Sequence, residues 1–168
     1  MTASIRRARG AALTLAAALG IVSGAQAGEI NIAESVLLPV KPAAGWALVG
    51  DFSALEGWHP AVAASTLKGT GRAAGDSRVL ILGDGAKIRE ELESYDAEGM
   101  SYSYRIVRSP LPVTDYVSTL SVSADGDGSR ITWQSSFDAK GDTPAAEAEK
   151  IMRGVYRGGL DAAAGLFE

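Results

Sequence analysis

The 168-residue sequence contains no cysteine and only one histidine, His59. The absence of cysteine excludes disulfide bonds and thiolate chemistry. A single histidine excludes a histidine-rich metal site, so we predict no metal ion. The sequence also lacks a Gly-x-Ser-x-Gly nucleophile motif and a glycine loop that could cradle phosphates. We therefore predict no cofactor.

Long hydrophobic runs are absent too, apart from one near the N-terminus. Three arginines, Arg6, Arg7 and Arg9, precede an uncharged apolar run over 11–22, and the small residues of Ala25-Gln26-Ala27 follow. A run of about 12 residues is too short to span a membrane, which takes about 20. This order predicts a signal peptide over 1–27, cleaved after Ala27, and hence a periplasmic or secreted protein that keeps no membrane anchor.

An excess of positive charge is missing from the remaining part, residues 28–168. Without the three leader arginines, 13 basic residues stand against 20 acidic ones, a formal net charge of −7. No basic block survives, which argues against nucleic acid and anionic membrane surfaces, and we predict no nucleic-acid partner. The length of this part suits one domain with a substantial core.

Strand patterns dominate 28–168. An alternating segment predicts a first strand over 29–38, and two short helices are expected over 43–51 and 53–57, the second with Ser53 as its N-cap. Further segments are rich in β-branched and aromatic residues and are separated by tight-turn signals. They predict six more strands, over 65–71, 77–82, 87–95, 101–108, 113–123 and 130–139.

The last segment predicts a long helix that Asp142 or Thr143 caps and that continues to Leu166. Gly158-Gly159 is expected to kink or thin it. An apolar stripe at helical spacing marks its buried face, formed by Ala148, Ile151, Met152, Val155 and Tyr156. We therefore predict an α+β fold in which a curled antiparallel sheet of about seven strands packs around this helix.

One carboxylate is placed unusually within these strands. Glu90 lies between Ile88 and Leu92, and side chains two apart on a strand share a face. Glu90 is therefore expected to point inward with two aliphatic neighbours. A buried carboxylate needs a partner or a ligand, since its desolvation is costly.

The turn around Asp84 decides which partner Glu90 meets. A three-residue loop, 84–86, would pair Leu82 with Ile88, Leu80 with Glu90 and Arg78 with Leu92. Arg78 would then lie diagonal to Glu90, within reach of its long side chain. A two-residue loop would instead put Val79 and Ile81 beside Glu90 and turn Arg78 outward. Both registers stay open, as do two roles for Glu90: anchoring a ligand, or forming an ion pair that only closes the barrel.

Four phrases of the sequence resemble one family: 75–80 (GDSRVL), 84–92 (DGxxIxExL), 111–116 (LPVxDY) and 131–137 (IxWxxxF). Together with the order of elements, they are similar to the SRPBCC superfamily, the helix-grip fold of START domains and the birch-pollen allergen. The nearest branch resembles the polyketide cyclase/dehydrase-like proteins, which include the exported MxaD-like group. The resemblance covers essentially all of residues 29–166, within a predicted domain of 28–168.

The resemblance implies an apolar cavity between sheet and long helix, with Glu90, Tyr116 and Ser118 at pocket positions and Trp58 near its mouth. The chain has Ala64 where related hormone receptors carry a pocket lysine, and its 83–85 turn is shorter than their gate loop, which argues against a receptor mechanism. Our candidate ligand-binding residues are Trp58, Arg78, Leu80, Leu82, Glu90, Tyr104, Tyr116, Ser118 and Trp133. Trp133 also suits plain core packing, and His59, next to a proline, is interpreted as a surface or turn residue.

Three functions are compatible with these features. The first is binding of an apolar small molecule, lipid-like or aromatic. The second is a cyclase or dehydratase that uses Glu90 as general acid or base. The third is an MxaD-like accessory factor with a periplasmic redox partner.

Overall fold

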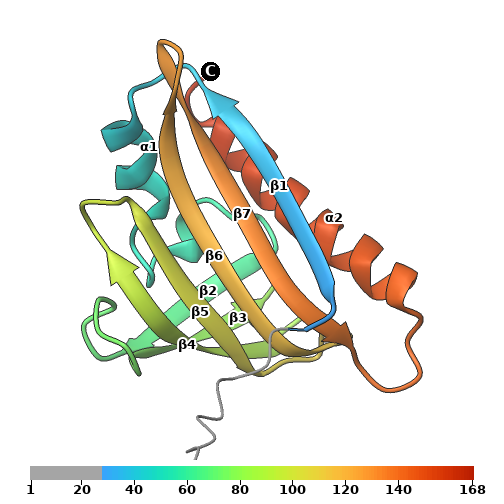
Figure 1. The fold of residues 1–168 in the computed structure, drawn as a ribbon. Helices are drawn as coiled ribbons and strands as arrows, with labels where there is room; N and C mark the ends of the chain where they lie inside the picture. Colours follow the sequence, from blue (N-terminus) through green and yellow to red (C-terminus); the bar gives the residue numbers. More distant parts are fainter. Residues whose placement is uncertain (1–27) are drawn as a thin grey trace, which may run out of the picture.

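The computed structural model describes residues 28–168, so the predicted signal peptide lies outside the described part. Seven antiparallel strands form one sheet, and a C-terminal helix packs on it (Figure 1). The strands are β1 (Ile30–Leu38), β2 (Val62–Lys68), β3 (Ser77–Leu82), β4 (Lys87–Asp96), β5 (Ser101–Arg108), β6 (Val113–Asp125) and β7 (Gly128–Ala139). The helical segments are α1 (Pro42–Val49), the 3-10 turn η1 (Leu55–Gly57) and α2 (Ala145–Gly165).

The sheet has the order β1-β7-β6-β5-β4-β3-β2, so β2 to β7 form a meander and β1 closes it beside β7. Both α1 and α2 cover the inner face, α2 along β1 and β7 and α1 against β6 and β7 (Figure 1). Inward side chains alternate along each strand, as a half-buried antiparallel sheet requires. The expected α+β helix-grip architecture is confirmed.

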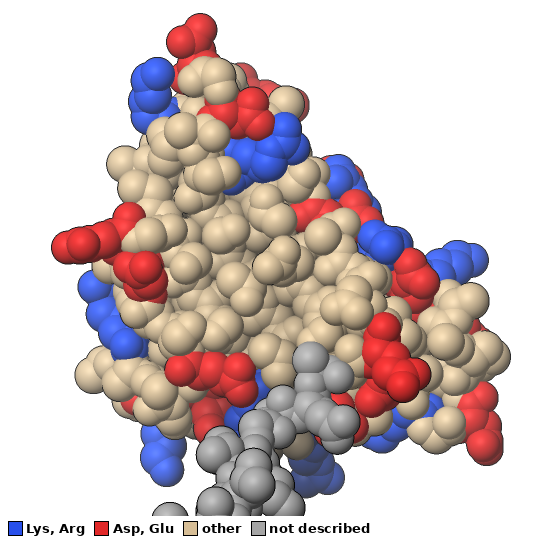
Figure 2. Space-filling model, in the orientation of Figure 1, with Lys and Arg blue, Asp and Glu red and all other residues tan. Residues whose placement is uncertain are grey.

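The outer face of the sheet looks different. Over β6 and β7 it is covered by small polar side chains, and its centre carries few charges (Figure 2). Charged residues gather at its rim instead (Figure 2). Among residues 28–168, no helix is long and apolar enough to cross a membrane.

The two short helices after β1 were predicted only in part. α1 begins at Pro42, since proline suits the first turn of a helix. The second segment is one 3-10 turn, and Ser53 does not cap it. The Ser53 amide and hydroxyl donate to the Asp51 carboxylate instead, at 2.8 and 2.7 Å.

α2 departs from expectation at its start. Pro144 takes the N-cap position without a side-chain hydrogen bond, so the predicted caps Asp142 and Thr143 were wrong. The helix runs uninterrupted to Gly165, through the glycine pair. Gly159 thins the helix rather than ending it: a β-carbon there would lie 2.5 Å from Cδ2 of His59.

The buried stripe of α2 also shifts from the predicted one. Its buried residues are Ala148, Met152, Tyr156, Gly159, Leu160 and Ala163. Ile151 is 37% exposed, because it lies roughly a third of a turn from the centre of that stripe.

Candidate functional site

The β3–β4 hairpin decides which residues face the interior. Its loop consists of residues 83–85, closed by a hydrogen bond of 2.8 Å from the Leu82 amide to the Ala86 carbonyl. Gly85 has a φ of +85°, in the left-handed region that favours glycine. The loop therefore begins one residue earlier than in the three-residue alternative.

This register places Arg78 directly opposite Glu90 and Leu80 opposite Ile88. Both predicted pairings were wrong: Arg78 is neither diagonal to Glu90 nor outside the barrel. The three-residue alternative gave the correct face, because its register differs from the observed one by two residues and a strand has period two.

Arg78 and Glu90 form a buried ion pair, with exposed fractions of 1% and 4%. Arg78 Nε donates to Glu90 Oε2 at 2.6 Å, and Arg78 Nη1 donates to the Phe52 carbonyl. The guanidinium also lies over the rings of Phe52 and Tyr104, 4.2 and 5.2 Å from their centroids. Burial is the largest single influence and would lower the pKa of Arg78, but the charge and hydrogen bond of Glu90, together with Tyr102 and Tyr104, raise it overall.

A cavity of about 80 Å³ lies between the sheet and α2. Six of the candidate residues line it: Leu80, Leu82, Glu90, Tyr104, Tyr116 and Trp133. The other three do not. Arg78 lies opposite Glu90 and pairs with it, Ser118 hydrogen-bonds the indole of Trp133, and Trp58 packs edge-on against Trp133 with ring centroids 5.6 Å apart.

Neutral polar groups converge on one side of this cavity. Trp133 Nε1 donates to the Tyr104 hydroxyl at 3.1 Å and to Ser118 Oγ at 3.0 Å. Tyr116 and Tyr156 share a close hydroxyl–hydroxyl hydrogen bond. Burial raises the pKa of Tyr156 to about 12 and that of Tyr104 and Tyr116 well above its usual range. These phenols are therefore protonated at neutral pH and available as donors. We call the four hydroxyl residues Tyr104, Tyr116, Ser118 and Tyr156, together with the Trp133 indole that bonds to them, the hydroxyl cluster.

Tyr156 is the main site residue that sequence reasoning missed, because it was assigned only to the apolar stripe of the helix. Its ring stacks on Trp133 with centroids 4.4 Å apart and planes 8° from parallel. A tyrosine on a buried helical stripe was the available signal, since its hydroxyl needs a partner inside. The other lining residues not predicted for the site include Leu55, Ile106, Leu111, Met152 and Val155.

His59 also lines the cavity and is only 4% exposed, so the interpretation as a surface residue was wrong. Its Nε2 lies 3.0 Å from the Val155 carbonyl, and its Nδ1 accepts the Ala61 amide at 3.2 Å. These bonds require the neutral ring with the proton on Nε2. Burial lowers the pKa of His59. The ring thus joins the turn before β2 to α2.

The cavity combines apolar walls with a few hydrogen-bonding groups and one carboxylate, Glu90. No group of three or more potential metal ligands comes together within residues 28–168. Glu90 has a hydrogen bond only to Arg78 among these residues. The phenols and the indole place hydrogen-bonding groups at the cavity, and aliphatic side chains form the rest of its wall.

Comparison with known proteins shows to which family this chain belongs. Residues 29–168 match the model of the family described as polyketide cyclase / dehydrase and lipid transport. The chain belongs to this family. It is thereby a member of the SRPBCC superfamily, as the sequence phrases predicted.

Several solved structures are similar to this chain. XoxI from Bacillus cereus is 31% identical, with a TM-score of 0.75 over 82% of this chain and 94% of that one. A protein from Thermobifida fusca is 33% identical, with a TM-score of 0.72 over 82% and 92%. Ara h 8.0201, at 20% identity and a TM-score of 0.67 over 82% and 97%, shares the fold. No curated protein sequence matches this chain.

Proposed function

We propose that the protein binds an apolar small molecule, lipid-like or aromatic, in the cavity between the sheet and α2. The observation that carries the proposal is the wall of this cavity, which is aliphatic and aromatic apart from Glu90, His59 and the polar atoms of Trp133 and the three tyrosines of the hydroxyl cluster. Apolar walls with a few convergent polar groups are typical of ligand sites, where burial supplies affinity and the polar groups fix orientation. The family description, which includes lipid transport, supports the same function.

The size of the cavity limits what enters without rearrangement. About 80 Å³ holds a molecule of few heavy atoms, whereas sites for drug-sized ligands measure about 300–1,000 Å³. A larger ligand must therefore displace side chains. Met152 is suited to this, because its unbranched side chain adapts to irregular space.

A cyclase or dehydratase that uses Glu90 as acid or base is the alternative, which the family description also supports. The contact of Glu90 with Arg78 argues for orientation rather than proton transfer, because the carboxylate already has a charged partner at 2.6 Å. We further propose that the protein is exported after removal of residues 1–27.

Native mass spectrometry of the protein purified from its own host tests the proposal. We expect a co-purifying small mass, or uptake of an added aliphatic alcohol such as dodecanol, that Tyr156→Phe or Glu90→Gln weakens. A protein that takes up neither lipid nor aromatic probes would contradict it. Turnover that Glu90→Gln abolishes while binding persists would favour the enzyme. Retention of a dehydrogenase or cytochrome by the ligand-free protein would favour the accessory role.

A further inference from the structure

The sheet forks between β5 and β6. Regular pairing of these strands ends at Arg105 and Val117, and residues 106–108 and 113–116 have no ladder partners in each other. A bulge between Thr114 and Val117 on the β6–β7 side, with Asp115 at a φ of +50°, bends β6 away. A groove of about 1090 Å³ lies on the molecular surface at this fork.

The groove and the cavity share two wall residues, Ile106 and Tyr116. Tyr116 is 3% exposed and belongs to the hydroxyl cluster. The outer groove and the inner cavity are therefore adjacent at these two residues.

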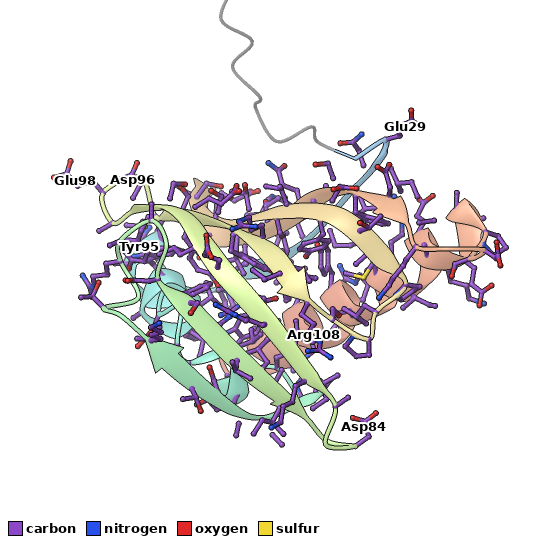
Figure 3. All side chains as sticks on the ribbon, turned by 90° about the horizontal axis from the view of Figure 1, so that it is seen from below. Glu29, Asp84, Tyr95, Asp96, Glu98 and Arg108 are labelled. Carbon is purple, nitrogen blue, oxygen red and sulfur yellow. The ribbon has the colours of Figure 1, made fainter. Side chains whose placement is uncertain are left out.

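Four cations line the groove, although the protein is acidic as a whole: Lys87, Arg89, Arg108 and Lys140. None of them forms an ion pair within residues 28–168, and Lys140 Nζ only donates to the Ser109 carbonyl at 3.4 Å. Asp115 is the one carboxylate in the wall. The acidic β4–β5 turn, with Asp96 and Glu98, lies at the other end of the sheet from Arg108 (Figure 3).

Arg89 and Arg108 are direct cross-strand partners on β4 and β5. Like charges directly opposite each other destabilise a sheet. An anion bound between them would remove that repulsion and form charge-assisted hydrogen bonds with both guanidinium groups.

We propose that this groove binds the anionic head group, a carboxylate or phosphate, of a single-chain amphiphile whose apolar part enters the cavity at the fork. This inference deepens the proposed function and rests on it. It narrows the ligand class from apolar molecules in general to anionic amphiphiles.

The test compares dodecanoate with dodecanol by titration calorimetry on the mature protein. We expect dodecanoate to bind at least about 10-fold more tightly, since charge-assisted hydrogen bonds favour the anion. This preference should decline with added salt and disappear in Arg89→Gln/Arg108→Gln. The matched control Lys68→Gln/Lys150→Gln removes two other exposed cations and should keep it. The unliganded groove variant should be as stable as the wild type or more so, because a repulsive pair is gone.

Each other result overturns the inference. Equal affinity for dodecanoate and dodecanol would show that the groove does not bind the head group, while the proposed function would still hold. Binding of neither probe would overturn both. A preference for dodecanoate that survives in the groove variant would place the anion elsewhere. Inorganic phosphate that binds as tightly as dodecanoate would identify a free-anion site and exclude the amphiphile.

Discussion

The interior of the sheet holds two buried polar groups that differ in charge. The Arg78–Glu90 pair is ionic, and the Arg78 guanidinium is further enclosed by the Phe52 carbonyl and by aromatic rings. The hydroxyl cluster is neutral, and each of its phenols can donate or accept. Removing a charge from the first leaves an uncompensated ion, whereas the second can reorganise around a ligand. The difference predicts that a single substitution costs the most stability in the pair, and it assigns ligand orientation mainly to the cluster.

The largest effect is expected from Arg78→Met, which leaves the Glu90 carboxylate buried without its partner. We expect a loss of about 3–5 kcal/mol in the free energy of unfolding, measured by urea denaturation. The double variant Arg78→Met/Glu90→Leu should recover most of it, since an apolar pair of similar volume needs no counter-charge.

The exposed pair Arg105–Glu91 is a matched control, with side chains 44% and 28% exposed. Arg105→Met should cost at most about 1 kcal/mol, because solvent screens such pairs. Equal losses for Arg78→Met and Arg105→Met would mean that burial of the first pair has no energetic consequence, and the contrast would fail.

Gly159→Ala is expected to disturb the packing beside the hydroxyl cluster. Its β-carbon would lie 2.5 Å from His59 Cδ2 and 3.2 Å from Trp133 Cζ3, and both rings are buried. We expect a loss of about 1–3 kcal/mol in thermal unfolding, as for other overpacked cores. Gly158→Ala is the control: nothing lies within 4 Å of its β-carbon, so the better helix propensity of alanine should raise stability.

Tyr156→Phe removes one hydroxyl of the cluster without changing the stack on Trp133. We expect a loss of about 1 kcal/mol in stability, because Tyr116 then keeps only the longer contact of 3.5 Å with the Tyr104 hydroxyl. Binding of dodecanol should weaken as well. Tyr95→Phe, a partly buried ring outside the cavity, should leave both unchanged. A loss of stability with unaltered binding would separate the cluster from the ligand.

The smallest effect concerns pH. The pKa of His59 in the folded protein lies below its usual 6.5, so the unfolded chain binds the proton more tightly. Its stabilising contribution is therefore complete above pH 6.5 and declines as pH falls from there through the folded pKa. The melting temperature of the wild type should drop more between pH 7 and 5 than that of His59→Gln. Parallel curves would show that the ring titrates normally.

Much of the fold was predictable because local patterns agree with it. Period-two alternation and glycine-containing turns define the meander, and helical spacing defines α2. The helix caps were not predictable in this way, since the Ser53 hydroxyl bonds to its neighbour Asp51 instead of capping a helix. The hairpin register was not predictable either. A shift of two residues leaves every side chain on the same face, so the hydrophobic pattern cannot distinguish the two registers.

From residue patterns alone, the site was predictable only where the alternation within a single strand reveals a residue. Glu90 stood out because of its aliphatic neighbours on the same strand. The stack of Tyr156 on Trp133 joins segments whose docking no local pattern encodes. The same holds for the cationic groove, because its basic residues lie on β4, on β5 and just after β7 and form no block in the sequence.

The pairing of β1 with β7 has a consequence for the order of folding. Ile30 in the first strand pairs with Phe137 in the last strand. The first strand can therefore pair only after the last strand is available, and such non-local topology slows folding. We propose that the protein is exported. Slow folding would then keep the polypeptide largely unfolded during translocation, and the sheet would form after the chain has crossed the membrane.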